Sequence, residues 1–130
     1  MTKLILINGQ SGAGKTTVAR SLMQSYCEAE YETIILCGLL NTQQKLDMFL
    51  KNISHYQIYY FWLEVDQDVR NQRRIDRARD DSDKPECFDY IDELLPDLKK
   101  PLLVSEGRFE FINANRSVDE IVLEIGSIVK

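Results

Sequence analysis

Short apolar runs alternate along the chain with longer segments in which apolar residues recur every three or four positions. Three runs of strand length, at 4–7, 33–37 and 57–65, are rich in β-branched and aromatic residues. Runs of this kind are typical of buried parallel strands. A fourth strand is predicted at 109–112, and the weaker run at 102–104 is interpreted as no more than an edge strand.

Helical periodicity follows these strands. The pattern predicts helices from Lys15 to residues 27–30, from Asn41 or Thr42 onward, over 88–95 ahead of Pro96, and from Ser117 to the end of the chain. The last helix begins with a capping box of the Ser-x-x-Glu form. Strands separated by helices favour right-handed crossovers and a sheet covered on both faces. The predicted fold class is therefore α/β, a three-layer α/β/α arrangement with a mainly parallel sheet of four or five strands.

Length and charge narrow the class of protein. A chain of 130 residues suits one domain spanning 1–130. With 21 acidic against 16 basic side chains the net charge is -5, so we expect no nucleic-acid partner and no binding to anionic lipid. No apolar run is long enough to span a bilayer and the start of the chain lacks a secretory leader, which predicts a cytoplasmic protein. Three widely spaced cysteines and one histidine predict neither a disulfide framework nor a zinc site.

One glycine-rich segment gives the strongest chemical signal. The residues Gly9, Gln10, Ser11, Gly12, Ala13, Gly14, Lys15 and Thr16 match Gly-x4-Gly-Lys-Ser/Thr between an apolar strand and an amphipathic helix. In such a phosphate loop, N–H groups and the helix N-terminus surround a phosphate, Lys15 bridges the outer phosphates and the Thr16 hydroxyl binds Mg²⁺. A plain turn would leave unexplained a lysine at a helix N-terminus, where its charge opposes the dipole. We therefore predict a nucleotide site over residues 9–17, including Thr17.

A cluster of arginines follows the third predicted strand. Five of the eight arginines lie within ten residues that contain no lysine: Arg70, Arg73, Arg74, Arg77 and Arg79. Their three- and four-residue spacing allows the first four to share one broad helix face, and guanidinium groups suit phosphate oxygens and base planes. A solvated helix balanced by aspartates would explain an isolated cluster, but the phosphate loop favours an anion-binding role. The polar segment 68–86 is predicted to form a mobile lid over the triphosphate.

These features together resemble the P-loop small-molecule and nucleotide kinases, the group that includes adenylate, shikimate and gluconate kinases. The resemblance lies in residues 4–17, in residues 61–65 followed by Val69 and the arginine run, and in residues 109–120. It implies the P-loop NTPase fold with ATP and Mg²⁺ as cofactors.

The resemblance also implies roles for individual residues. Arg74 and Arg77 would be lid or base-stacking arginines and, with Lys15, would serve catalysis. Asn113 and Arg116 would lie beside the adenine and help to bind the nucleotide.

The chain departs from this group in two places. Members usually have a further strand and an acceptor-binding helical segment after the first helix. Here only residues 28–32 lie between the first helix and the strand at 33–37. Members also tend to place an Asp at the end of a core strand beside the phosphate loop, where this chain has Cys37 or Gly38. Asp66 is interpreted as an N-terminal charge of the next helix, and His55 as a surface loop residue.

Two functions remain open on this basis. The favoured one is transfer of the γ-phosphoryl of ATP–Mg²⁺ to a small-molecule hydroxyl or phosphate acceptor, supported by the retained Lys15, Thr16 and arginines. The alternative is a nucleotide-binding regulatory or pseudo-kinase module without phosphotransfer, supported by the two departures. No Asn-Lys-x-Asp stretch is present to bind guanine. The expected partners are ATP and an unidentified small-molecule acceptor, and the sequence leaves the oligomeric state open.

Overall fold

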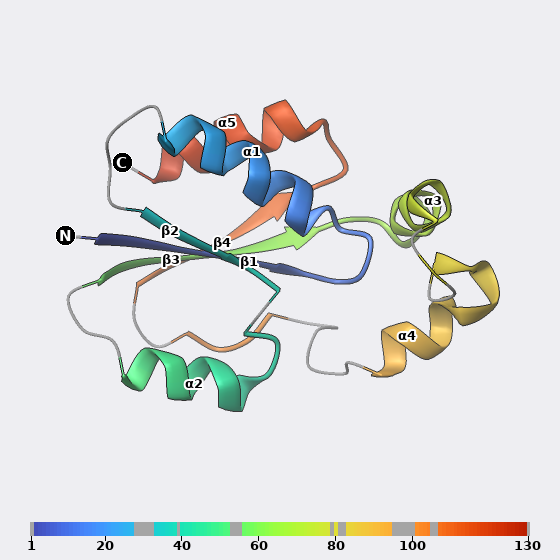
Figure 1. Cartoon of the computed structure of the whole chain (residues 1–130), viewed down its shortest axis with the longest axis horizontal. Helices are drawn as coiled ribbons and strands as arrows, with labels where there is room; N and C mark the ends of the chain where they lie inside the picture. The colour runs from blue at the N-terminus through green and yellow to red at the C-terminus, as the bar shows by residue number, and fades with distance from the viewer. Residues whose placement is uncertain are drawn as a thin grey trace.

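The computed structural model describes most of the chain. The described residues are 2–27, 33–38, 40–52, 56–78, 80, 83–94, 101–104 and 107–129. In this part, helices cover both faces of a four-stranded sheet (Figure 1). The predictions for His55, Arg79 and Pro96 lie outside the described residues.

The sheet is entirely parallel. Its strands are β1 (Thr2–Gly9), β2 (Thr33–Cys37), β3 (Tyr56–Glu64) and β4 (Arg108–Asn113). They lie in the order β2-β1-β3-β4, and each neighbouring pair is parallel. The strand that leads into the phosphate loop is therefore central, with Ile7 paired to Cys37 on one side and Phe61 on the other. The predicted α/β class with a parallel sheet is confirmed.

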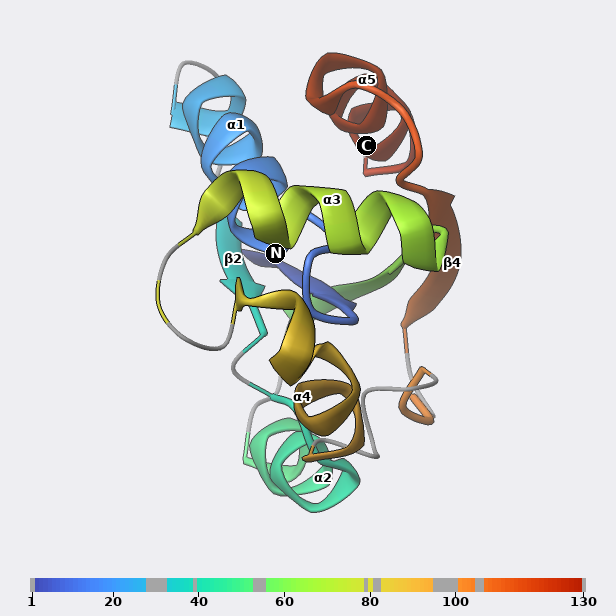
Figure 2. The same cartoon turned by 90° about the vertical axis from the view of Figure 1, so that its right-hand side faces the viewer.

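The described residues form five α-helices, α1 (Lys15–Cys27), α2 (Gln43–Lys51), α3 (Gln67–Arg77), α4 (Phe88–Leu94) and α5 (Val118–Ile128), with a short 3-10 helix η2 (Pro85–Cys87) before α4. Helices α1 and α5 cover one face and α2 covers the other, while α3 and α4 lie beyond the edge where the strands end (Figures 1 and 2). The predicted caps are present, because Thr42 and Ser117 accept hydrogen bonds from the N–H groups of Lys45 and Glu120.

The two central strands are buried on both faces because successive side chains point to opposite sides of a strand. On the side of α1 and α5, Ile5, Ile7 and Phe61 pack with Leu22 and Ile125. The opposite face is formed by alternate residues of the same strands, Leu4, Leu6, Tyr60 and Trp62. They pack against Leu46 of α2 and Leu102 of the 101–104 segment. This double burial explains the continuous apolar runs that predicted these strands.

The run at 102–104 does not form an edge strand. Its backbone bonds to side chains instead: Leu102 N–H donates to the Tyr60 hydroxyl at 3.3 Å, and Leu103 exchanges two 2.8 Å bonds with the Gln43 amide. The Tyr60 hydroxyl also accepts from Asn8 Nδ2 at 3.2 Å, and burial raises the pKa of Tyr60. Because Asn8 directly precedes the phosphate loop, this buried network fixes the point where the loop begins.

Candidate nucleotide-binding site

The phosphate loop connects the end of β1 to the start of α1. Ala13 N–H donates to Gln10 O at 3.0 Å, which closes a tight turn. Gly12 and Gly14 have φ values of 82° and 93°, a region that side chains rarely adopt. At Gly12 a Cβ would also lie 2.7 Å from Arg70 O, so only glycine fits between the loop and α3.

Lys15 lies at the mouth of this loop. Its Nζ donates to Gly9 O at 2.9 Å and to Gln10 O at 3.2 Å. The end of β2 comes next to it, since a Cβ at Gly38 would lie 3.4 Å from Lys15 Cε. Cys37 and Gly38 therefore occupy the strand end beside Lys15, and neither supplies a carboxylate.

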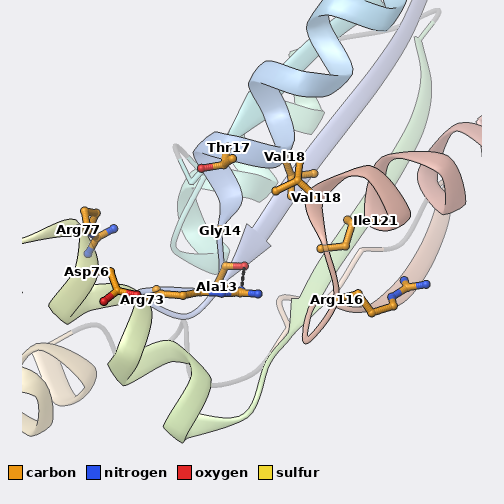
Figure 3. A pocket seen from close by; sticks show the side chains of 11 residues that line it. Ala13, Gly14, Thr17, Val18, Arg73, Asp76, Arg77, Arg116, Val118 and Ile121 are labelled. Carbon is orange, nitrogen blue, oxygen red and sulfur yellow. Dashed lines mark hydrogen bonds between the residues drawn. The ribbon is translucent and has the colours of Figure 1, made fainter.

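A pocket of about 350 Å³ opens beside the loop (Figure 3). Its lining comes from the phosphate loop, the first turns of α1 and α5, the connection between β4 and α5, and α3. The lining residues are Gly12, Ala13, Gly14, Thr17, Val18, Arg73, Asp76, Arg77, Arg116, Val118 and Ile121. One wall is apolar, while arginines lie on two other sides. The pocket thus combines a phosphate loop with a surface suited to a flat, uncharged group.

The arginines of α3 divide into two pairs. Arg73 and Arg77 line the pocket. Arg73 donates to Ala13 O at 3.0 Å and to Ala114 O at 2.7 Å, so it joins the phosphate loop to the connection between β4 and α5. Arg77 donates through Nε to the buried carboxylate of Asp83 at 2.9 Å.

The other pair is buried against α4. Arg70 is 4% exposed and Arg74 is fully buried. They bind opposite oxygens of Asp92, at 3.3 Å and 3.0 Å respectively, and the Arg74 guanidinium lies 4.4 Å from the centre of the Phe88 ring. We call Arg70, Arg74 and Asp92 the arginine–carboxylate cluster. Two cations share one carboxylate in it, and Arg70 Nε, Arg74 Nε and Arg74 Nη1 have no hydrogen-bond partner among the described residues.

Comparison with known proteins agrees with this geometry. Residues 1–84, well over half of the chain, match the family described as Novel STAND NTPase 3. The chain belongs to this family. No curated protein matches this STAND NTPase.

Solved structures show how the fold of this STAND NTPase relates to kinases. It is similar to an unliganded sugar kinase from Janibacter sp., with 15% identity, a TM-score of 0.63, and coverage of 99% of this chain and 95% of that one. A deoxyadenosine kinase from M. mycoides has 15% identity and a TM-score of 0.61, with coverage of 97% of this chain and 98% of that one. A gluconokinase from Sinorhizobium meliloti has 15% identity and a TM-score of 0.58, with coverage of 94% of this chain and 88% of that one. The resemblance to P-loop kinases is confirmed at the level of the fold.

The structure brings together most of the residues that the sequence placed at the site. Residues 9–17 form the loop and the start of α1, and of these Gly12, Ala13, Gly14 and Thr17 line the pocket together with Arg77 and Arg116. The lining does not include Gly9, Gln10, Ser11, Lys15 and Thr16. Thr16 and Thr17 are exposed in the first turn of α1. Asn113 does not line the pocket; its backbone O accepts from Arg116 Nε at 2.8 Å, so it helps to orient that arginine.

Two expectations about α3 differ from the structure. Its four arginines do not share one face, and Arg74 lies outside the pocket, fully buried in the arginine–carboxylate cluster. The physical reason is the half-buried carboxylate of Asp92 on α4, which binds Arg70 and Arg74 on the side of α3 away from the pocket.

Asp92 is the site residue that the sequence analysis missed. It lies four positions after Phe88, a predicted core residue, and residues with this spacing share a helix face. This spacing from Phe88 was the signal in the sequence that Asp92 would be partly buried. Arg73 was recognised only as one member of the arginine cluster, because its partners Ala13 and Ala114 lie far from it in sequence.

Two absences concern the part of this STAND NTPase that the structure describes. Among those residues no group of three or more His, Cys, Asp or Glu side chains is arranged to bind a metal ion. None of the described helices has the length and apolar content needed to cross a membrane.

Proposed function

We propose that the protein binds ATP–Mg²⁺ in the pocket beside the phosphate loop and transfers the γ-phosphoryl group to a small-molecule acceptor. The observation that supports this most is that one pocket joins Gly12 and Gly14 of the loop to an apolar wall and to arginines. A phosphate chain and an attached base need these two surfaces side by side.

The base would occupy the apolar end of the pocket. Val18, Val118 and Ile121 offer a surface for one face of a flat ring. Arg116 offers a guanidinium plane whose orientation is fixed, because it donates to Asn113 O and, at 2.7 Å, to Glu124. Arginine planes stack favourably on aromatic rings.

The triphosphate would lie in the loop. Its oxygens would replace Gly9 O and Gln10 O as acceptors for the Lys15 ammonium, and the α1 N-terminus adds partial positive charge. The exposed Thr16 hydroxyl suits one Mg²⁺ ligand position. Since the described residues provide no cluster of acidic ligands, Mg²⁺ would arrive with the nucleotide, and phosphates and water would complete its coordination.

Transfer would depend on cations close to the moving phosphoryl group. Arg77 lines the same pocket as Gly12 and Gly14, and beside Asp83 its side chain stays 37% exposed. Positioning and neutralisation of developing charge provide most of the catalysis in this type of reaction. The lid over 68–86 stays a prediction.

An acceptor screen tests this proposal. Purified protein is mixed with ATP–Mg²⁺ and, in separate reactions, nucleosides, nucleoside monophosphates, sugars, sugar acids and shikimate, and ADP release is measured. Lys15→Ala is the blank, and Lys45→Ala, an exposed lysine of α2, is the matched control. We expect release that requires one acceptor, is lost in the blank and persists in the control. Equal ATP affinity for the unmodified protein and Lys15→Ala would show that the site is wrongly placed.

A second candidate function is nucleotide binding without transfer. It is favoured by Cys37 and Gly38 at the end of β2, which leave the position beside Lys15 without a carboxylate to act as base or Mg²⁺ ligand. ATP binding that depends on Lys15, with no ADP release for any acceptor, would support this candidate and contradict phosphotransfer.

A further inference from the structure

Two carbonyl groups of the phosphate loop are bound from outside by arginines of α3. Arg70 Nη1 donates to Ser11 O at 3.2 Å, and Arg73 Nη1 donates to Ala13 O at 3.0 Å. The described chain has no cis peptide bond. In a trans peptide the C=O and N–H groups point in opposite directions, so each contact also fixes the direction of the next N–H, that of Gly12 or Gly14.

Both of these N–H groups are available to a ligand. Within the described residues neither the Gly12 nor the Gly14 N–H donates a hydrogen bond to the protein. Gly12 is nevertheless buried, with its Cα packed against the Arg70 carbonyl and the Arg74 stem. Unpaired backbone donors on one side of a loop form the concave surface that binds phosphate.

We propose that Arg70 is a positioning residue for the nucleotide, which directs the Gly12 N–H towards a bound phosphate by binding Ser11 O. This inference rests on the proposed function. Arg70 is buried and does not line the pocket, so it acts through the loop. Its positive charge polarises the Ser11–Gly12 peptide and makes the N–H a stronger donor. Arg73 acts on Gly14 in the same way, but it also lines the pocket, so Arg70 allows the cleaner test.

Arg74 provides a matched control on the same helix. Like Arg70 it is buried, binds Asp92 and lies against Gly12. Unlike Arg70, it makes no hydrogen bond to the phosphate loop among the described residues. Arg74→Met keeps the Cγ that packs near Gly12 and removes one buried positive charge, as Arg70→Met does. In their hydrogen bonds to the phosphate loop, the two variants therefore differ in the bond to Ser11 O.

The first measurement is affinity, by titration calorimetry with ATP–Mg²⁺ and with pyrophosphate–Mg²⁺. We expect Arg70→Met to weaken both ligands about tenfold, the size expected for a charge-assisted hydrogen bond, and Arg74→Met to change them less than about threefold. Pyrophosphate shows whether the loss concerns the phosphates, since it lacks the base. If the methionine variants do not fold, Arg70→Lys and Arg74→Lys replace them, because both keep the charge and lose the planar fork.

The second measurement reports on the loop itself. The chain has six glycines, so selective ¹⁵N-glycine labelling gives a simple spectrum in which the Gly12 amide can be followed. We expect this resonance to move in the Arg70 variant without ligand and to stay near its original position in the Arg74 variant.

Equal weakening of binding by both substitutions, or a Gly12 resonance unmoved in the Arg70 variant, would overturn the positioning role. Failure of the proposed function has a different signature, because Lys15→Ala would then bind ATP as tightly as the unmodified protein.

Discussion

The two sides of α3 have the same kind of residue and opposite environments. On one side Arg70 and Arg74 are buried and bind Asp92, and three of their guanidinium nitrogens have no hydrogen-bond partner in the part of the chain that the structure describes. On the other side Arg73 and Arg77 line an open pocket. Buried charges are stable only when they are paired, whereas charges at a pocket are available to a ligand. Substitutions on the first side should therefore affect folding, with Arg70 also acting on binding through its bond to Ser11 O, and those on the second side should affect ligand binding.

The largest effect is expected where the buried side loses Asp92, the carboxylate that both arginines bind. Asp92→Asn leaves two buried guanidinium groups without a counter-charge, so we expect the free energy of unfolding to fall by about 3–5 kcal/mol. Urea denaturation measures it. Asp89→Asn, an exposed position on the same helix, is the control and should change little. Adding Arg74→Met to Asp92→Asn should recover part of the loss; no recovery would show that uncompensated charge is not the cause.

The pocket side should respond in binding. Arg73→Met removes the hydrogen bonds to Ala13 O and Ala114 O and a cation beside the ligand. We expect ATP–Mg²⁺ affinity to fall by about 10- to 100-fold, corresponding to roughly 1.5–3 kcal/mol for bonds from a charged donor. Fluorescence titration with a labelled nucleotide measures the change. Arg20→Met, an exposed arginine of α1, should bind like the unmodified protein. A variant that binds normally but unfolds easily would break the distinction between the two sides.

Gly12 packs against α3 and also lines the pocket, so its substitution should affect both stability and ATP binding. Gly12→Ala places a Cβ 2.7 Å from Arg70 O at a φ of 82°, so we expect about 1–3 kcal/mol of lost stability together with weaker ATP binding. Gly126→Ala is the control, since that helical glycine has open space around it and should gain about 0.5–1 kcal/mol. Unfolding and binding measured on the same samples test both expectations. A Gly12→Ala protein as stable as the original would show that α3 can move away from the loop.

The smallest effect concerns a buried polar group remote from α3. Tyr60→Phe removes the acceptor for Asn8 and Leu102, which should cost about 1 kcal/mol near neutral pH.

The pH dependence of this variant follows from the raised pKa of Tyr60. The phenol ionises in the unfolded chain near its ordinary pKa of 10.0 and only at higher pH in the folded protein, so its contribution to stability is complete below pH 10.0 and is lost as pH rises through the folded value. Unfolding free energies measured from about pH 8 to about pH 11 should fall more steeply for the unmodified protein than for Tyr60→Phe. Tyr90→Phe, at an exposed position, should follow the unmodified protein.

Local signals in the sequence determined much of the fold and one half of the site. The apolar run of β1, the spacing of the glycines and Lys15, and the caps at Thr42 and Ser117 each involve neighbouring residues, so their structural consequence can be derived without knowing the rest of the molecule. The parallel sheet followed because strands alternated with helices. The phosphate loop was therefore predictable to the residue.

The other half of the site was decided by contacts between distant parts of the chain. Helical spacing put four arginines on α3, but which of them faces the nucleotide depends on the rotation of the helix about its axis. That rotation is set by Asp92 on α4 and by the carbonyls of Ala13 and Ala114, which the chain brings together only when it folds. A buried cation must lie where a carboxylate or carbonyl can bind it, and the sequence does not show where those oxygens are. For this reason tertiary structure alone placed Arg73 at the pocket and Arg74 in the interior.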